Sequence, residues 1–410
     1  MPTIIGVMAT FDTKGQQAEY VREQLETLGS QALLVDLGVT GTPTIPGDVT
    51  REEVARAGGM PLDDLLRNPS REAAQPIMAR GAIRILQDRV KAGALHGLIG
   101  LGGLQGTAVC TEVMRALPYG LPKVMVSTVA SGNTAAYVDV MDITMMFSVA
   151  DIIGLNAFLR KVLANAAGAA HGMAQVEVSL PTERRGQTLI GMSNLGVLTS
   201  GALLALEEFA ARGYEVIVFH AVGSGGRAME LMMRQGIITA VFDYAMGEIT
   251  DELFGGVRAG GQERLTVAGE LGLPQVLCPG GAEHVGLLVS PPSSVPDKYK
   301  DHKYVFHNPV IFVPRLQAAE IVEVARDIAR RLEHTRGNAV LMLPLAGTGS
   351  YAKPGGPLND PLSDAAFFSE LKARVPRTLA VVERNAHAED PDFVREAVDR
   401  LIALIERRDA

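Results

Sequence analysis

The sequence predicts an α/β protein made of two doubly wound, Rossmann-like domains with parallel sheets. Short apolar runs, typical of strands buried on both faces of a sheet, alternate with helical segments along the whole chain. At 410 residues the chain is long enough for two domains of roughly 100–200 residues each. A short, charged segment with a proline, Ser179–Gly186, marks the expected boundary. We therefore expect an N-terminal domain over residues 1–180 and a C-terminal domain over residues 184–410.

The first half of the chain contains five apolar runs that predict strands. They are Thr3–Ala9, Ala32–Leu37, His96–Gly100, Lys123–Thr128 and Ile143–Val149. Helical patterns lie between the runs and after the last: one from the polar loop Thr10–Gly15 to Leu28-Gly29, then Arg71–Lys91, Thr107–Leu117 and Leu155–Ala170. Residues 38 to 70 are rich in Gly, Pro, Thr and Asp, which predicts an excursion or flap with a short helix at most.

The second half repeats this alternation, and we expect its strands to form a second parallel sheet. The strands are expected at Thr188–Met192, Glu215–His220, Ile238–Asp243, Pro274–Leu277, Val310–Val313, Ala339–Pro344 and Thr378–Glu383. The helices are expected at Gly201–Ala211, Arg227–Gln235, Arg264–Leu271, Ala318–His334, Ala365–Arg374 and Asp392–Arg407.

Composition excludes several classes of protein. Lys and Arg total 38 against 46 Asp and Glu, a net charge of -8, and no basic block interrupts the chain, so nucleic acid is not an expected partner. The chain has no apolar stretch of about 18 residues and no secretory leader pattern. Its two cysteines, Cys110 and Cys278, lie far apart and suit buried free thiols. We expect a soluble cytoplasmic protein that holds anionic ligands by local groups.

Glycine clusters between strands and helices are the strongest functional signal. Gly102, Gly103 and Gly106 follow a predicted strand, and Thr107 begins a predicted helix. Such a turn directs free N–H groups and the positive end of a helix at an anion. The spacing differs from the dinucleotide fingerprint, and no P-loop motif occurs. We favour a phosphate or carboxylate site over the alternative, a tight turn of purely structural use.

Two further strand ends in the first half carry polar groups. At the first, Lys14 would face a phosphate and Asp12 or Thr13 would contact sugar or metal, beside Gly15; the alternative is a helix cap with a solvated lysine. The second strand end holds small hydroxyl and amide groups that could hydrogen-bond to phosphate oxygens or to the edge of a base. The alternative is a turn in which these groups cap the local backbone. These are Ser127, Thr128, Ser131, Gly132 and Asn133.

The second half offers candidate catalytic residues. His220 ends a predicted strand beside the turn Gly223–Arg227, where it suits general acid–base work, and Arg227 suits a carboxylate or phosphate clamp. Asp243 ends the next strand, and His307 lies in an expected polar loop, Phe306–Pro309. The alternative for His220 is a hydrogen bond to backbone.

Metal sites are weaker hypotheses. Glu283, His284 and His307 together are candidate ligands, but their spacing fits no known pattern. Asp142 and Asp151 are candidates for Mg²⁺, although Asp151 suits a helix cap better.

The chain resembles one family from about residue 3 to residue 400. Six stretches carry the resemblance, and they occur in the same order as in the family. They are Gly6–Gly15, Gly100–Ala108, Pro122–Gly132, Asp142–Asp151, Val218–Arg227 and Phe306–Pro309. The family is the one related to the ATP-binding N-terminal region of the tomato mosaic virus resistance protein. The resemblance implies two Rossmann-like domains, ATP binding and a homodimer. The sequence departs from the family pattern at Pro279–His284 and Gly347–Tyr351, which leaves the ligand of the second domain open.

Together these observations favour an ATP-binding protein whose interdomain cleft closes on a small anionic metabolite, with Mg²⁺ as a possible companion of ATP. Two alternatives remain open. One is a non-catalytic, nucleotide-regulated module that binds a protein partner. The other is a nucleotide-independent isomerase or lyase with His220 or His307 as the base.

Overall fold

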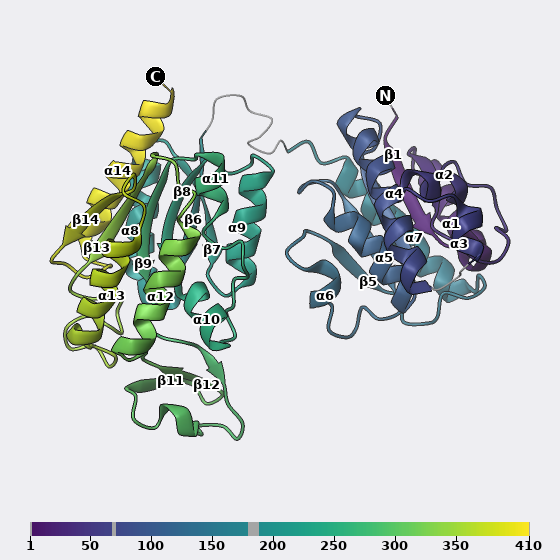
Figure 1. The fold of residues 1–410 in the computed structure, drawn as a ribbon. Helices are drawn as coiled ribbons and strands as arrows, with labels where there is room; N and C mark the ends of the chain where they lie inside the picture. Colours follow the sequence, from purple (N-terminus) through teal and green to yellow (C-terminus); the bar gives the residue numbers. More distant parts are fainter. Residues whose placement is uncertain (1, 68–70, 179–187, 410) are drawn as a thin grey trace. The chain divides into compact units, whose positions relative to one another are not determined.

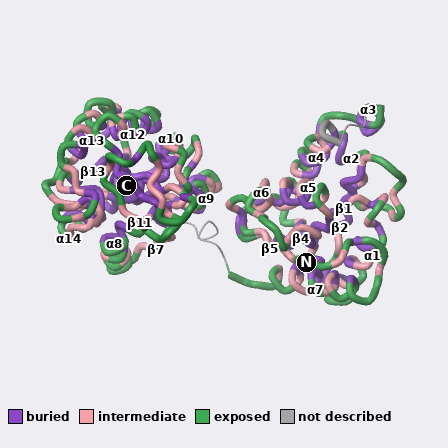
Figure 2. Tube along the Cα trace, turned by 90° about the horizontal axis from the view of Figure 1, so that it is seen from below, coloured by how far each residue is buried: buried purple, intermediate pink, exposed green. Residues whose placement is uncertain are grey.

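The computed structural model describes residues 2–67, 71–178 and 188–409. The chain divides into two units, Met1–Val178 and Ser179–Ala410, which we treat separately as the first and second domains (Figure 1). The expected boundary segment, Ser179–Gly186, lies outside the described residues. In each domain the buried segments are strands and the inner sides of helices, with exposed loops around them (Figure 2).

The first domain is built on a five-stranded parallel sheet with the order β2-β1-β3-β4-β5. The strands are β1 (Ile4–Ala9), β2 (Gln31–Asp36), β3 (Gly97–Gly102), β4 (Lys123–Ser127) and β5 (Thr144–Phe147). Helices α1 (Phe11–Thr27) and α7 (Ala157–Ala174) pack on one face of the sheet. Helices α4 (Arg71–Lys91) and α5 (Leu104–Arg115) pack on the other. This confirms the predicted doubly wound fold.

The segment between β2 and α4 contains two helices, α2 (Arg51–Ala57) and α3 (Leu62–Arg67), so the prediction of a single short helix was wrong. Helix α2 begins with a capping box, in which Thr50 and Glu53 each accept from the other's backbone N–H. Apolar side chains of both helices are buried in the core beside α4. The short helix α6 (Ala135–Val138) was also not predicted.

The second domain has a six-stranded parallel sheet with the order β14-β13-β9-β8-β6-β7. The strands are β6 (Leu189–Asn194), β7 (Glu215–His220), β8 (Ala240–Ala245), β9 (Gln275–Gly280), β13 (Ala339–Pro344) and β14 (Ala380–Arg384). The helices are α8 (Thr199–Ala211), α9 (Ser224–Arg234), α10 (Gly247–Phe254), α11 (Val267–Leu271), α12 (Ala318–Arg331), α13 (Pro361–Arg374) and α14 (Pro391–Asp409). The domain also contains the 3-10 turns η2 (Gly196–Leu198) and η3 (Asp297–Tyr299).

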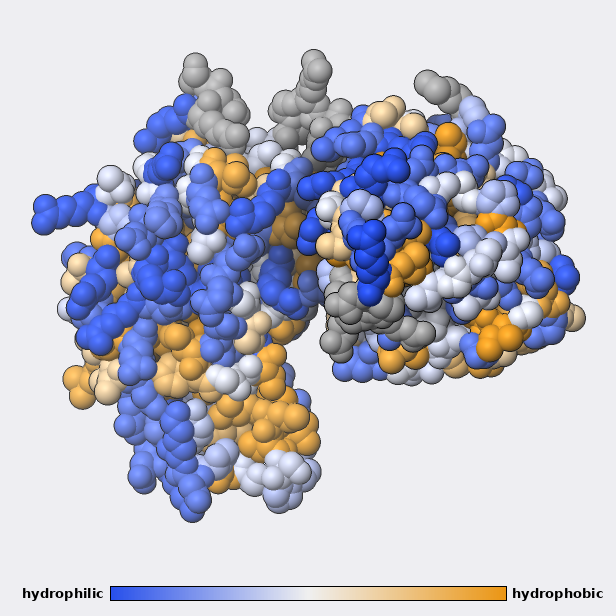
Figure 3. Space-filling view, turned by 45° about the vertical axis from the view of Figure 1, so that its right-hand side comes forward, coloured by the Kyte–Doolittle hydropathy of each residue, from blue (hydrophilic) through white to orange (hydrophobic). Residues whose placement is uncertain are grey.

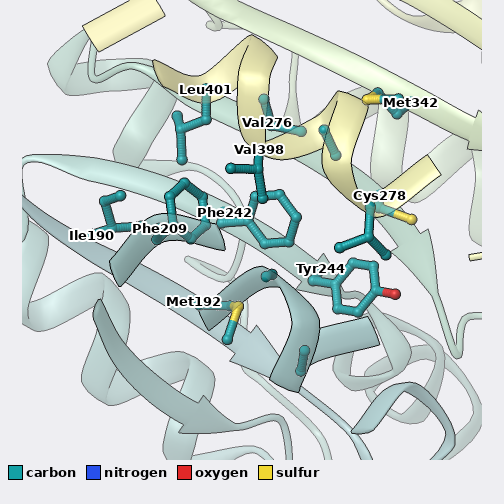
Figure 4. Packing of buried hydrophobic residues seen from close by; sticks show 14 of the residues in the cluster. Ile190, Met192, Phe209, Phe242, Tyr244, Val276, Cys278, Met342, Val398 and Leu401 are labelled. Carbon is teal, nitrogen blue, oxygen red and sulfur yellow. The ribbon is translucent and has the colours of Figure 1, made fainter. Parts of the chain in front are cut away.

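Helices cover both faces of this sheet. Helices α8 and α14 pack on one face, over a core that includes Phe209, Phe242 and Tyr244 (Figure 4). Two smaller groups, α12 with α13 and α9 with α11, pack on the opposite face. Successive residues of a strand, such as Val241 and Phe242, belong to cores on opposite faces because side chains alternate along it.

One predicted strand belongs to a different sheet. Residues Val310–Val313 were expected in the parallel sheet, but β12 (Ile311–Pro314) pairs antiparallel with β10 (Leu287–Leu288) and β11 (Tyr304–Asn308). Only Pro309 and Val310 separate β11 from β12, and so short a connection permits a hairpin but no parallel crossover. In Figure 3 hydrophobic side chains gather on this small sheet at the foot of the view.

Candidate functional site

A pocket of about 320 Å³ opens in the first domain at the carboxyl ends of β1, β2 and β3. The strand order makes β1 and β3 neighbours whose connections leave in opposite directions, and ligands of open α/β sheets bind at such a switch point. The lining residues are Ala9, Thr10, Asp12, Thr13, Lys14, Leu37, Gly38, Val39, Thr40, Ala74, Gln75, Met78, Leu101, Gly103, Leu104, Gln105, Gly106, Val109 and Cys110.

The N-terminus of α5 forms one polar wall of this pocket. Gly103 is its N-cap residue and supplies no capping side chain, and the first turn of the helix, Leu104–Gly106, lines the pocket. A Cβ atom on Gly102 would lie 2.5 Å from the backbone carbon of Gly106. Glycine is therefore required for strand and helix to meet this closely, and an anion gains the helix N-terminus as a partner.

The N-terminus of α1 forms the second polar wall. The Thr10 and Thr13 hydroxyls lie 2.8 Å apart, and Lys14 is half-buried beside them. At Lys14 the helix departs from helical geometry (φ -127°, ψ 15°). No carboxylate within the described ranges forms an ion pair with Lys14, so its ammonium group is available to a ligand in the pocket.

The remaining wall is mostly apolar. It combines Leu37 and Val39, which follow β2, with Met78 of α4 and Val109 of α5. The pocket therefore has a polar side at two helix N-termini and an apolar side between α4 and α5. A ligand with an anionic group and a flat apolar group matches this division.

Five of the thirteen predicted ligand-binding residues line the pocket: Asp12, Thr13, Lys14, Gly103 and Gly106. Gly15 and Gly102 instead permit close backbone packing; the former lies against Thr44. The Thr107 and Ser127 hydroxyls form a buried 2.7 Å hydrogen bond that joins α5 to β4.

The loop after β4 lies outside the pocket lining. Thr128 approaches most closely, with its hydroxyl 3.6 Å from where a Cβ on Gly103 would stand, whereas Ser131, Gly132 and Asn133 are exposed. Sequence reasoning missed the residues that follow β2 and the apolar side chains of α4. The position of Gly38–Thr40 directly after a strand was a usable signal, since β2 is the neighbour of β1.

The glycine turn of the second domain holds a carboxylate from the protein itself. The N–H groups of Gly223 and Gly226 donate to Oε1 of Glu248, at 2.6 and 3.0 Å. Glu248 is fully buried and also pairs with Arg264 at 2.7 Å. These two N–H groups are therefore not available to an external anion.

Asp243 is buried rather than exposed to a ligand. Its two carboxylate oxygens accept from Arg264 at 2.5 and 2.6 Å, and Ser193 donates to it at 2.7 Å. Both oxygens are thus engaged by side chains of the core, and the catalytic role of Asp243 stays a prediction.

The other three candidate catalytic residues lie at the surface. His220 is exposed at the end of β7, with Nδ1 3.3 Å from the Asn194 carbonyl oxygen, and Arg227 is exposed in the first turn of α9. His307 is exposed in β11, in the antiparallel sheet, and not in the loop that was expected. The structure does not gather these groups into one site.

The metal hypotheses are also corrected. His284 Nδ1 lies 2.8 Å from Glu283 and its Nε2 lies 3.2 Å from Arg258, so both ring nitrogens are engaged. Glu283 further accepts from Thr348 at 2.6 Å. The described residues contain no group of three or more His, Cys, Asp or Glu that could hold a metal ion.

The two aspartates proposed for Mg²⁺ have local structural roles. Asp142 pairs with buried Lys123 at 2.8 Å. Asp151 accepts from the N–H of Ile152, and Asn156, not Asp151, caps α7.

Comparison with known proteins places the chain in a family. Residues 3–179 match the family described as "Uncharacterised protein family (UPF0261) N-terminal domain", and residues 187–405 match the corresponding C-terminal domain. The chain belongs to the UPF0261 family. The first match ends at residue 179 and the second begins at residue 187, close to the division between the domains.

Several UPF0261 proteins are similar over nearly their whole length. One from Clostridium tetani is 36% identical over 402 residues, 98% of each chain, and one from Mesorhizobium japonicum is 36% identical over 393 residues, 95% of this chain and 96% of that one. The ToMV resistance protein Tm-1 of Solanum lycopersicum is 33% identical over 315 residues, 76% of this chain and 42% of that protein. A Listeria monocytogenes crystal structure named for a UDP-N-acetylglucosamine 2-epimerase is 11% identical, with a TM-score of 0.23 over 68% of this chain and 79% of that one, too low to support an argument.

The structure also bears on two sequence expectations. Cys110 and Cys278 are buried free thiols, as predicted. Among the helices that the structure describes, none combines the length and apolar character needed to cross a membrane.

Proposed function

We propose that the first domain of this UPF0261 protein binds ATP in the pocket at the carboxyl ends of β1–β3. The observation that carries the proposal is the contrast between the two glycine turns. The turn of the second domain is occupied by Glu248, whereas Gly103–Gly106 borders a pocket that Lys14 also lines. An anion there would gain a helix N-terminus and an ammonium group that forms no ion pair within the described part of the chain.

The shape of the pocket supports a nucleotide over a bare anion. Phosphates would lie at the polar side, and the base would lie at the apolar side near Leu37, Val39 and Met78. One carboxylate residue, Asp12, stands among the lining residues that the structure describes. Mg²⁺ would therefore enter as the counter-ion of the phosphates, the usual way in which nucleotide sites hold it.

We further propose that the protein is a cytoplasmic homodimer that acts on a small anionic metabolite. Two buried free thiols support a reducing compartment. A second candidate function is a non-catalytic binding module that is regulated by a nucleotide. One observation favours it: two of the candidate catalytic residues lie apart, since Asp243 is held in the core and His307 lies in a separate sheet. Saturable ATP binding without turnover of any metabolite would support this second candidate.

Thermal unfolding with and without Mg-ATP tests the proposal. At a hundredfold excess over Kd a ligand stabilises the folded state by about 2.7 kcal/mol, which raises Tm by about 5 °C or more in a domain of this size. Lys14→Ala removes the cation and Gly103→Val fills the mouth of the pocket, so both should abolish the shift. Lys91→Ala, an exposed lysine at the end of α4, is the matched control and should keep it. No shift at millimolar Mg-ATP in the native protein would refute ATP binding.

A further inference from the structure

Asp12 lines the proposed nucleotide pocket, and one of its two carboxylate oxygens has no hydrogen-bond partner among the described residues. Its Oδ1 is buried and forms no hydrogen bond with any described residue. Buried carboxylate oxygens in native proteins nearly always accept hydrogen bonds, so an orphan oxygen in a pocket wall requires an explanation. A donor on the ligand would provide one.

A second carboxylate, Asp36, occupies the place where Rossmann domains usually bind ribose. That place is the end of the second strand, and Asp36 is the last residue of β2. However, Asp36 is buried, and its Oδ1 accepts from the N–H of Phe11 at 3.0 Å and of Gly38 at 2.8 Å. It joins β2 to the start of α1 and does not line the pocket.

Asp12 stands next to this occupied position. A Cβ atom on Gly38 would lie 3.0 Å from Oδ1 of Asp36 and 3.6 Å from Oδ1 of Asp12, so the two carboxylates flank the same glycine. Gly41 passes over Asp12 with a φ of +70°, where a Cβ would lie 2.9 Å from its Oδ2. These glycines bring the chain after β2 against Asp12 and place its carboxylate beside the ribose position.

Asp12 has neighbours on both sides of the pocket: it stands two residues before Lys14, and its Oδ1 lies 3.6 Å from a Cβ built on Gly38, the residue between Leu37 and Val39. The phosphate groups would lie beside Lys14 and Gly103, and the base beside Leu37 and Met78. In any nucleotide the ribose connects these groups. We propose that Asp12, in place of Asp36, accepts a hydrogen bond from a ribose hydroxyl, so that the pocket selects ribonucleotides. This inference rests on the proposed nucleotide binding.

Calorimetric titration of the full chain tests this selection. The ligands are ATP, 2′-deoxy-ATP, 3′-deoxy-ATP and inorganic tripolyphosphate, each with Mg²⁺ and with EDTA. At least one deoxy analogue should bind about tenfold or more weakly than ATP, since a hydrogen bond to a charged group is lost. Asp12→Ala should bind ATP as weakly as that analogue and should bind tripolyphosphate as tightly as the native protein. Asp63→Ala, an exposed carboxylate in α3, is the control and should behave as native.

Three outcomes would overturn the inference. If both deoxy analogues bind the native protein within twofold of ATP, Asp12 does not bind ribose while nucleotide binding stands. If Asp12→Ala weakens ATP and tripolyphosphate alike, and only with Mg²⁺, the carboxylate binds a cation instead. If neither ATP nor tripolyphosphate binds at all, the proposed function fails and this inference fails with it. The comparison of analogues on the native protein decides the matter even if Asp12→Ala does not fold.

Discussion

At the scale of single residues, the most consequential group in the second domain is Arg264. It is fully buried and pairs with three carboxylates: Asp243 at 2.5 and 2.6 Å, Glu248 at 2.7 Å and Glu230 at 3.3 Å. One guanidinium cannot neutralise three ionised carboxylates. Burial, with the nearby Asp243 charge adding to it, raises the pKa of Glu230 to about 7, although Arg264 opposes the shift.

This shift makes stability depend on pH in a defined direction. In the unfolded chain Glu230 titrates near 4.5, so between pH 4.5 and about 7 the folded state retains a proton that the unfolded state has lost. The contribution of Glu230 to the free energy of unfolding therefore falls as pH rises through that window, by about 1–3 kcal/mol. In Glu230→Gln this part of the pH dependence should disappear.

Urea denaturation at pH 5 and at pH 7.5 measures the effect. The quantity to compare is the difference in unfolding free energy between the two pH values, because Glu230→Gln can also lower stability at both. An unchanged difference in the variant would show that Glu230 is ionised in the folded protein at pH 5.

At the scale of elements, the two glycine turns show how one pattern can serve two purposes. Both follow a buried strand and begin a helix, α5 in the first domain and α9 in the second. The first borders the pocket, while the second closes on Glu248, which comes from α10. Whether such a turn can accept an external anion therefore depends on residues outside the turn.

The packing around the second turn predicts a large effect of one methyl group. A Cβ on Gly226 would collide with the Glu248 carboxylate and lie 2.5 Å from Nε of Arg264. Gly226→Ala should therefore break the buried ion pair and lower the free energy of unfolding by about 3 kcal/mol or more. Gly196→Ala is the matched control, since a Cβ there meets nothing within 4 Å. Equal stability of the two variants, measured by urea denaturation, would contradict this account of the turn.

At the scale of the whole molecule, each domain has hydrophobic cores of its own. The two cores of the first domain contain residues of that domain alone, and the three cores of the second contain residues of the second alone. Within each sheet, every strand also pairs with strands of the same domain. Each domain therefore has what it needs to fold independently.

Separate expression of the domains tests this independence. Residues 2–178 should fold cooperatively and keep the rise in Tm with Mg-ATP, because every lining residue of the pocket lies in that range. Residues 188–410 should fold without any response to nucleotide. Far-ultraviolet circular dichroism during heating reports both properties. Loss of the shift in the first fragment, with folding intact, would mean that the second domain contributes to the site.

Local chemistry in the sequence was enough to determine the doubly wound fold, and five of the residues it singled out line the pocket of the first domain. Apolar runs such as Ala339–Pro344 became strands with the predicted bounds, because a strand buried on both faces must be apolar throughout. Asp12, Lys14 and Gly103 line one pocket because they follow strands whose carboxyl ends share an edge of the sheet. Only the tertiary structure decided that Glu248 occupies the second turn and that Arg264 holds Asp243. Those contacts join residues from different elements, and no local pattern encodes which distant side chain a buried carboxylate will meet.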